Sequence, residues 1–489
     1  MAPHLPLNTR ICTVVALTLA TFFTPVIFAA SPTAPNIILV LADDMGYGDT
    51  GFTGSEKLRT PHLDALARSG VFCSQGYVVS SVCSPSRAGL LTGRDPRRFG
   101  YEGNLNRDDK HYATRPELLG LPPGELTLGD HLRSAGYATA LIGKWHQGIG
   151  PGFHPNERGF DYFCGMLAGS HSYFPLRDRN SIERNGTPVT EFSNDYLTDF
   201  FTDEGIRWMA DQKTQKTPWF VFMSYNAPHG PMHATEADLA KFTHIEDPIR
   251  RTYAAMMWAL DRGVGRIHDW LKSNGEMENT LIVFFSDNGG PSSNGSWNGP
   301  LSGGKGALKE GGIRVPMIWS WPAALPAGKT YTEPVSALDL LPSFLTAANA
   351  APLPLRAPLS HEDPRNHKRG VQKFGAYDGI NLLPYLRAES PAKPRSLFWR
   401  LQGQAAVRNG DRKLLRLSHR PAELFAPHED AGELNDLSFE ERERTEALFK
   451  ELADWESMLP TVPLWDSSPF WQSESAKHYD DRDAAAEPK

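Results

Sequence analysis

The chain has 489 residues, of which 40% are hydrophobic and 22% are charged, a composition typical of a globular protein with one large domain and room for a smaller one. Its net charge of −7 and the absence of any basic run argue against nucleic-acid binding. Its 43 glycines and 39 prolines indicate many loops, as on an α/β scaffold.

The first 29 residues are typical of an export signal. Arg10 precedes a largely apolar stretch, and small residues follow at Ala29 and Ala30. A membrane anchor is the alternative, but Pro25 interrupts the stretch and the small residues favour cleavage. No later segment is long and apolar enough to span a bilayer. We therefore expect a protein exported to the periplasm or the extracellular space, with no transmembrane anchor after cleavage of residues 1–29.

Apolar strands alternate with helices along residues 30–350, the expected catalytic domain. This alternation predicts a large, mostly parallel, doubly wound sheet with helices on both faces. The predicted strands lie at 36–42, 71–78, 137–146, 280–290 and 315–322 and within 217–231. The predicted helices lie at 60–70, 126–136 and 251–275, and a further helix begins near Cys83.

The composition changes after residue 350. Residues 351–395 include a charged, proline-rich stretch and are predicted to be a linker. Residues 396–470 are predicted to form a smaller α+β subdomain, with short antiparallel strands at 396–402, 404–410 and 412–418 and a helix at 439–459. The tail, 471–489, is polar and is predicted to be disordered.

Charged or metal-binding side chains follow several of the apolar strands. In open α/β sheets, ligands bind at the carboxyl ends of the strands, so side chains scattered along the sequence can meet in one crevice there. These residues are Asp43, Asp44, Lys144, His146, His229, Asp287 and Asn288. The acidic and amide members offer hard oxygen ligands without sulfur or imidazole, which favours Ca²⁺ or Mg²⁺ over zinc.

The cysteines raise a separate question. Removal of the signal takes Cys12 with it and leaves Cys73, Cys83 and Cys164, an odd number for an exported protein. Cys73 and Cys164 are candidates for a disulfide, which nothing local in the sequence tests. Cys83 precedes Ser-Pro-Ser-Arg at the start of a predicted helix, and its simplest interpretation is a small buried hydrophobic residue.

Residues 81–93, SVCSPSRAGLLTG, resemble the signature C-x-P-S-R-x-x-L-x-T-G of the type I sulfatases. Residues 136–146 are similar to the second signature of that family. Other segments resemble family motifs in the family's order, namely DDMGYGD, ERGFDYFCG, APHGP, DNGG, GGKGALKEGGIRVP and AELFAPHEDAGELNDLS. The resemblance spans roughly residues 35 to 460 and implies an alkaline-phosphatase-like fold.

The resemblance also implies a set of roles. Cys83 would be oxidised to formylglycine by a formylglycine-generating enzyme that recognises Pro85 and Arg87. Residue 83 would complete the shell of one Ca²⁺ ion, whose other ligands would be Asp43, Asp44, Asp287 and Asn288. Arg87 would hold the hydrated aldehyde, Lys144 and Lys305 would bind sulfate oxygens, His229 with Lys305 would protonate the leaving alcohol, and His146 would accept a proton.

The sequence thus predicts an exported, Ca²⁺-dependent sulfatase that acts on a sulfated carbohydrate. An algal galactan such as carrageenan, a glycosaminoglycan and a small aryl sulfate all remain open as substrates. His171, Tyr173 and His233 are further candidates for substrate contact, with a purely structural role equally open. The alternative functions are a phosphodiester or phosphonate hydrolase on the same scaffold and a non-catalytic glycan-binding protein.

Overall fold

The computed structural model describes residues 34–105, 119–175, 181–354, 377–418, 420–460 and 463–465, together with Met1 and Tyr479. The predicted export signal, the middle of the predicted linker and all but one residue of the predicted tail lie outside the described residues. The expected cleavage, the linker and the disorder of the tail therefore stay predictions. Residues Ala34–Lys489 form one compact unit.

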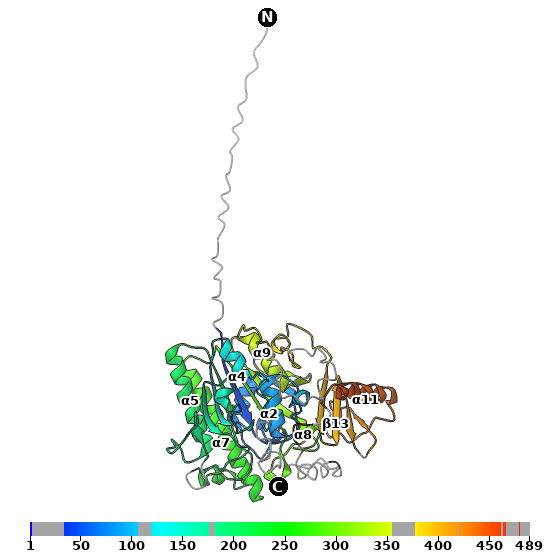
Figure 1. Cartoon of the computed structure of the whole chain (residues 1–489), viewed down its shortest axis with the longest axis horizontal. Helices are drawn as coiled ribbons and strands as arrows, with labels where there is room; N and C mark the ends of the chain where they lie inside the picture. The colour runs from blue at the N-terminus through cyan, green and yellow to red at the C-terminus, as the bar shows by residue number, and fades with distance from the viewer. Residues whose placement is uncertain are drawn as a thin grey trace. The chain divides into compact units, whose positions relative to one another are not determined.

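A mostly parallel sheet of eleven strands forms the centre of this unit (Figure 1). Its order is β10-β2-β9-β8-β1-β7-β3-β4-β5-β6, and β11 pairs with β2. The strands are β1 (Asn36–Ala42), β2 (Val71–Tyr77), β3 (Ala138–Lys144), β4 (Tyr162–Met166), β5 (Glu183–Arg184), β6 (Thr187–Pro188), β7 (Trp219–Ser224), β8 (Thr280–Ser286), β9 (Arg314–Ser320), β10 (Lys329–Tyr331) and β11 (Val335–Ser336). The inner strands are continuous runs of buried apolar residues, as expected where helices cover both faces of a sheet.

One central strand, β9, runs antiparallel to both of its neighbours. It pairs antiparallel with both β2 and β8, whereas β8, β1, β7, β3 and β4 run parallel to one another. Residues 287–313 between β8 and β9 contain only two one-turn helices and no crossover helix. The chain therefore re-enters the sheet at the same end at which β8 leaves it. For this reason β9 runs antiparallel to β8.

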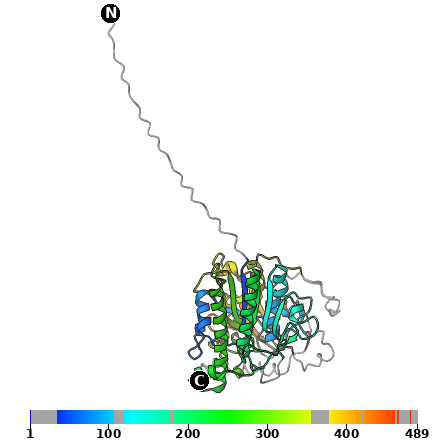
Figure 2. The ribbon, with the colours of Figure 1, turned by 90° about the vertical axis from the view of Figure 1, so that its left-hand side faces the viewer.

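Helices cover both faces of the sheet, and side chains along β1 alternate between them. Ile37 and Leu39 pack in one apolar cluster with α2 (Cys83–Thr92), α4 (Leu128–Ser134) and α9 (Leu340–Ala347). Ile38 and Val40 pack in a second cluster with α1 (Pro61–Ser69), α5 (Leu197–Gln215) and α7 (Pro248–Ser273), the side seen in Figure 2. This alternation, with a side-chain period of two, confirms the predicted layered α/β architecture.

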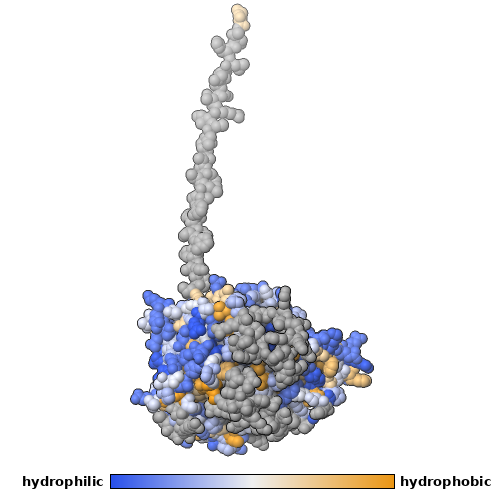
Figure 3. Space-filling model, viewed as in Figure 1, coloured by the Kyte–Doolittle hydropathy of each residue, from blue (hydrophilic) through white to orange (hydrophobic). Residues whose placement is uncertain are grey.

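The remaining helices of this part are short. They are α6 (Glu236–Leu239), α8 (Glu310–Ile313), α10 (Leu383–Leu386) and the 3-10 turns Gly51–Thr53, Pro96–Phe99, Pro155–Glu157, Ala240–Phe242, Ser292–Asn294 and Ala337–Asp339. Within the described residues, no helix has the length and apolar character needed to cross a bilayer. On the face shown in Figure 3, hydrophilic residues predominate over α5, which buries only part of its circumference.

A second sheet of four antiparallel strands follows in the C-terminal part. Its strands are β12 (Ser396–Leu401), β13 (Gln404–Asn409), β14 (Arg412–Leu417) and β15 (Glu423–Phe425). Trp399 and Leu415 on one face join the core of the main sheet, and the indole of Trp399 donates to the carbonyl of Val78 at 2.8 Å. Val407 and Leu414 on the other face pack against α11 (Arg442–Ser457). The predicted smaller α+β subdomain is therefore present.

The structure answers the open question about the disulfide. Cys73, Cys83 and Cys164 are all free thiols. Cys73 lies on β2 and Cys164 on β4, with five strands between them. Six strand spacings of about 4.8 Å put the two thiols roughly 29 Å apart, far beyond the reach of a disulfide.

Candidate active site

Two neighbouring parallel strands, β1 and β8, end in the acidic part of the site. Their last residues, Ala42 and Ser286, are paired, so Asp43 and Asp287 leave the sheet side by side. Asp44 has a left-handed backbone conformation (φ 67°), and its N–H donates to a carboxylate oxygen of Asp287 at 3.2 Å. The side-chain amide of the next residue, Asn288, donates to Asp44 at 2.7 Å. All four side chains are buried, as the strand-end pattern predicts for side chains that meet in one crevice.

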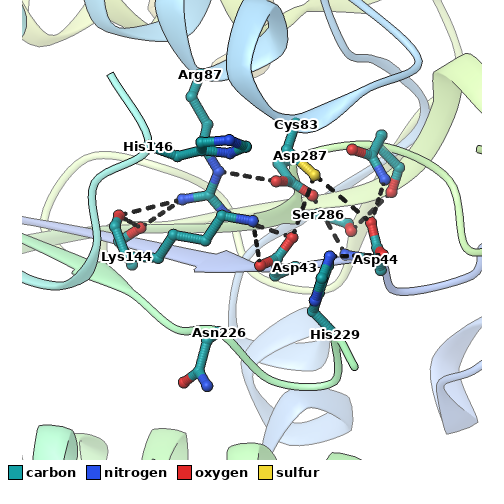
Figure 4. A network of polar contacts seen from close by, with 12 residues as sticks. Asp43, Asp44, Cys83, Arg87, Lys144, His146, Asn226, His229, Ser286 and Asp287 are labelled. Atoms are coloured by element: carbon teal, nitrogen blue, oxygen red, sulfur yellow. Dashed lines mark hydrogen bonds and ion pairs between the residues drawn. The ribbon is translucent and has the colours of Figure 1, made fainter. Parts of the chain in front are cut away.

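Cys83 is the first residue of α2 and faces these carboxylates (Figure 4). Its Sγ lies 3.6 Å from Asp43 Oδ1 and 3.9 Å from Asp44 Oδ1, and the residue is only 1% exposed. Burial raises the pKa of the Cys83 thiol to about 12. The next helix amide, that of Ser84, donates to Asn104 Oδ1 at 2.8 Å, so this amide is already used within the protein.

Each carboxylate of the cluster has a cationic partner of its own. Lys144 Nζ lies 2.6 Å from Asp43 Oδ2, and Arg87 Nε donates to Asp287 Oδ2 at 2.8 Å. Lys305 Nζ lies 2.6 and 2.7 Å from the two oxygens of Asp44 and 3.0 Å from Cys83 Sγ. Three buried anions thus face three buried cations, and the net charge of the cluster is close to zero before any ligand binds.

These contacts shift the ionisation of the cluster. Burial favours the protonated form of Asp44, but the positive charges of Lys305, His229 and Lys144 outweigh it and hold the pKa of Asp44 below its usual range. Burial opposes the charge of Lys305, yet the adjacent Asp44 raises the pKa of Lys305. Burial, with the nearby charge of Asp43, raises the pKa of Asp287 to about 6.

Two histidines approach the cluster from different strand ends. His146 follows β3, is 8% exposed and has a left-handed backbone (φ 58°), and its Nδ1 has no hydrogen-bond partner among the described residues. His229 follows β7. Its Nδ1 lies 2.6 Å from the carbonyl of Gly230, which leaves Nε2 facing Asp44 Oδ2 at 3.6 Å. Burial lowers both histidine pKa values, that of His229 to about 4.

The three weaker candidates lie around the His229 loop. Tyr173 is fully buried, and its hydroxyl lies 2.6 and 2.8 Å from the carbonyls of Asn226 and His229. His233 contacts Ser172 Oγ through Nδ1 at 3.4 Å, and His171 accepts the N–H of Ser181 at 3.1 Å and contacts the Ser172 carbonyl at 2.7 Å. Tyr173 therefore supports the His229 loop through hydrogen bonds to its backbone. His171 and His233 are instead bonded to neighbouring loop residues.

Two residues near the site were not predicted. Ser224, the last residue of β7, accepts a hydrogen bond from Arg87 and donates one to the carbonyl of Lys144, each at 2.6 Å. Its position at the end of an apolar strand was the available signal. Asn226 is 2% exposed, and neither polar atom of its side chain has a partner among the described residues (Figure 4). No signal in the sequence distinguishes this asparagine.

The donor set fits a hard divalent cation. Among the described residues, buried Asn288 Oδ1 has no hydrogen-bond partner, although the same amide donates to Asp44. This is expected of an oxygen that a cation would bind. Ligand atoms of Asp43, Asp44, Cys83 and His229 also lie within 4.8 Å of one another. We favour the predicted oxygen set over one that includes His229, because Ca²⁺ and Mg²⁺ prefer carboxylate and amide oxygens to imidazole.

Residues 35–350 match the family model described as Sulfatase. N-acetylgalactosamine-6-sulfatase of Canis lupus familiaris is 35% identical over 66% of this chain, and the alignment spans 64% of that protein's length. Arylsulfatase A of Homo sapiens is 32% identical over 78% of this chain and 74% of its own. Among solved structures, Ps i-CgsB in complex with k-i-k-neocarrahexaose is 36% identical, with a TM-score of 0.79 over 92% of this chain and 99% of that one. The chain therefore belongs to the sulfatase family, and its fold is alkaline-phosphatase-like.

Proposed function

We propose that this chain is an exported sulfatase that hydrolyses sulfate esters of a carbohydrate, with Ca²⁺ at the acidic cluster and Cys83 as the precursor of formylglycine. The observation that carries the proposal is the position of Cys83. Its Sγ lies between the carboxylates of Asp43 and Asp44 and the ammonium group of Lys305. A nucleophile at this position could attack an anionic ester whose charge is offset on several sides.

The side chains around residue 83 then have distinct tasks. The hydrated aldehyde would supply two hydroxyl groups on one carbon, and bound Ca²⁺ would withdraw charge from the sulfate. Arg87 would hold residue 83, and Lys144 and Lys305 would offset the charge that builds up on the sulfate oxygens. His229, with Lys305, would protonate the departing alcohol oxygen, and His146 would remove a proton from residue 83.

The burial of these groups supports one orientation of the substrate. The side chains of Lys144 and Asp43 are 0% exposed and those of Lys305 and Asp44 at most 4%, whereas that of His229 is 24% exposed. A sulfate ester would therefore enter with its sulfate group inward and its alcohol next to His229. This orientation agrees with His229 as the group that protonates the leaving oxygen.

For the substrate we propose a sulfated galactan of the carrageenan type. The support is Ps i-CgsB, which was solved with k-i-k-neocarrahexaose and aligns over nearly the whole of both chains. A glycosaminoglycan is the second candidate, because N-acetylgalactosamine-6-sulfatase is 35% identical over the aligned part. The 12 tryptophans and 14 tyrosines of the chain offer surfaces on which sugars can stack.

Two further parts of the proposal concern maturation. Residues 1–29 would direct the chain out of the cytoplasm and be cleaved, which places the mature enzyme in the periplasm or outside the cell. A formylglycine-generating enzyme would act on Cys83 before the chain becomes active. Peptide mass spectrometry of residue 83 and N-terminal sequencing of the secreted protein test these two steps separately.

The central test is the release of sulfate by protein that carries the modification. We expect the wild type to release sulfate from carrageenan or glycosaminoglycan oligosaccharides, and Cys83→Ala to be folded but at least about 10³-fold less active, because it lacks the nucleophile. Cys164→Ala is the matched control, since Cys164 is also a buried free thiol but lies on β4. Its activity should stay within about twofold of the wild type.

The same assay separates the rival functions. Faster turnover of a phosphodiester or a phosphonate monoester than of the matching sulfate would favour the hydrolase alternative. Tight binding of sulfated oligosaccharides without any turnover by modified protein would favour a glycan-binding protein. Full activity of protein that mass spectrometry shows to keep an unmodified Cys83 thiol would refute the proposed nucleophile.

A further inference from the structure

Lys305 lies on a tight turn that also contacts the segment leading to Cys83. The N–H of Ala307 donates to the carbonyl of Gly304 at 2.9 Å, and Gly306 has a φ of 89°, which a residue with a side chain rarely adopts. The N–H of Gly306 donates to the carbonyl of Ser81 at 2.8 Å. The backbone of this turn is therefore directly joined to the chain two residues before Cys83.

A glutamine of the C-terminal sheet holds the other side of this turn. Gln404, the first residue of β13, is 5% exposed. Its Nε2 donates to the carbonyl of Gly306 at 3.0 Å, and its Oε1 accepts the N–H of Leu308 at 3.1 Å. The hydroxyl of Tyr479 also accepts the N–H of Leu308, at 2.9 Å, and contacts Gln404. Gly306, the residue after Lys305, is thus held on both sides: its N–H bonds to the Cys83 segment and its carbonyl bonds to the C-terminal sheet.

The far end of the same loop is anchored by buried charges. Lys413 of β14 lies 3.0 Å from Glu310 and 2.8 Å from Glu433, and Glu433 accepts the N–H of Glu310 at 2.7 Å. All three residues are at most 4% exposed. Residues 306–310 are therefore fixed at both ends by the C-terminal sheet and the loop after it (β13 and α8 in Figure 1).

We propose that Gln404 is a positioning residue for Lys305, and that the C-terminal subdomain thereby completes the active site. Among the described residues, the side chain of Gln404 bonds to Gly306, Leu308 and Tyr479 and to no member of the acidic cluster. It sets the turn from which the Lys305 side chain reaches Asp44 and Cys83. A displacement of about 1 Å in a catalytic group can cost on the order of 10²-fold in rate. Loss of the Gln404 hydrogen bonds should therefore lower kcat measurably. The kinetic part of this inference rests on the proposed function, whereas the geometric part does not.

The first experiment measures the geometry. A crystal structure of Gln404→Leu should show Lys305 Nζ moved away from Cys83 Sγ and from Asp44 by more than about 0.5 Å. Trp399→Phe is the matched control, because it removes one hydrogen bond between the same sheet and the main domain, to Val78, without touching the Lys305 turn. Lys305 should keep its place in this control. An unmoved Lys305 in Gln404→Leu would overturn the proposal, whether or not the protein is a sulfatase.

The second experiment measures turnover of the sulfate ester that the wild type hydrolyses best. Gln404→Leu should lower kcat about 10- to 100-fold while KM changes less than about threefold, and Trp399→Phe should keep kcat within about twofold of the wild type. Equal losses of kcat in both variants would mean a general effect of subdomain packing and would overturn the positioning role.

Gln404→Glu covers the case in which the leucine variant does not fold. It keeps an acceptor for the N–H of Leu308 but presents a carboxylate oxygen to the carbonyl of Gly306. A kcat between that of the wild type and that of Gln404→Leu, with Lys305 displaced, would support the proposal. A wild-type kcat with Lys305 in place would overturn it. A wild type without any sulfate ester hydrolysis would refute the proposed function and leave the geometric result to stand by itself.

Discussion

Gly169 determines where the ring of His146 can lie. A Cβ added at Gly169 would lie 2.6 Å from Nε2 and 2.7 Å from Cε1 of His146, closer than nonbonded atoms approach one another. Gly169→Ala should therefore displace the imidazole from its present position and lower kcat on the order of 10²-fold, which steady-state sulfate release will measure. Gly150→Ala is the control, since the nearest atom to its added Cβ is 3.6 Å away. Equal activity of the two variants would mean that the position of His146 is not critical.

Replacement of His229 and replacement of His146 should slow different steps of the reaction. His229 lies at the more exposed side of the cluster, so His229→Ala should slow the first release of alcohol, by about 10²- to 10⁴-fold for a sugar sulfate and less for an activated aryl sulfate. His146→Ala should release the first equivalent of alcohol quickly and then turn over slowly. Rapid-quench measurements of alcohol and sulfate distinguish the two patterns. If His229→Ala gives the burst of alcohol and His146→Ala does not, His146 is the acid and His229 the base.

The sequence indicates the candidate catalytic residues, but it does not indicate the residues that position them. Cys83 stands in a recognisable motif at the start of a helix, and Lys144 and His229 stand in motifs at or after strand ends. Tyr173 supports the His229 loop through hydrogen bonds to two carbonyls. Gln404 bonds to the turn at Gly306, about 100 residues earlier in the chain. Such contacts depend on how distant segments pack, and a single tyrosine or glutamine carries no local signal for them.

At the scale of elements, α5 is tied to the edge of the sheet by a buried carboxylate. Glu204 of α5 contacts Tyr162 of β4, Arg184 of β5 and Arg207. Burial alone would raise the pKa of Glu204, but hydrogen bonds from the two arginines and the tyrosine lower it to about 2. A carboxyl whose pKa is depressed in the folded state stabilises the fold above its unfolded pKa of about 4.5 and loses that contribution as pH falls towards 2.

Glu204→Gln should therefore destabilise the protein by about 1–2 kcal/mol near pH 7, after allowance for the partial exposure of both arginines. The difference from the wild type should shrink as pH falls below about 5. Urea unfolding at several pH values measures this dependence. Asp211→Asn is the control on the same helix, because its pairing with Arg207 is largely exposed and should be worth less than about 0.5 kcal/mol. A difference independent of pH would show that the charge of Glu204 is not the cause.

Elements were predictable where burial follows a simple period. The continuous apolar runs of β1, β7 and β8 and the amphipathic face of α7 were recognised within a few residues of their observed bounds. The 19-residue helix α5 was not predicted, because its buried face includes polar residues such as Thr198, Glu204 and Gln212. The reversed direction of β9 was not predicted either, since it depends on the course of the whole segment from 287 to 313.

At the scale of the whole molecule, the acidic cluster joins the ends of the two strands at the centre of the large sheet. A cation that binds this cluster binds only the folded chain, so it should stabilise the protein by about 3–4 kcal/mol at 100 to 1,000 times its Kd. We expect a chelator to lower Tm by several degrees and Ca²⁺, but not Zn²⁺, to restore it. Calorimetry of the unmodified protein measures this without reference to activity.

Asp287→Asn is the matched variant for this prediction. It removes the negative charge of one proposed ligand but keeps the size of the side chain, so the response of Tm to chelator and to Ca²⁺ should be reduced. An unchanged Tm of the wild type in chelator would count against a structural cation at the cluster. If Tm of the variant responds to chelator and to Ca²⁺ as much as Tm of the wild type, Asp287 is not a ligand of the cation.

The burial of α2 limits the time at which the proposed maturation could take place. Every residue from Cys83 to Thr92 is buried, including Pro85 and Arg87, which the modifying enzyme is expected to read. A formylglycine-generating enzyme would therefore have to reach this segment before the segment folds. In the folded chain Gly306 bonds to Ser81, so we expect the segment to be covered only after Gly306, about 220 residues after Cys83, has been synthesised. At 5–20 residues per second, synthesis of that stretch takes roughly 10–45 s. The active fraction of the protein would then be set by a race between modification and chain closure, and faster folding would lower the yield of active enzyme.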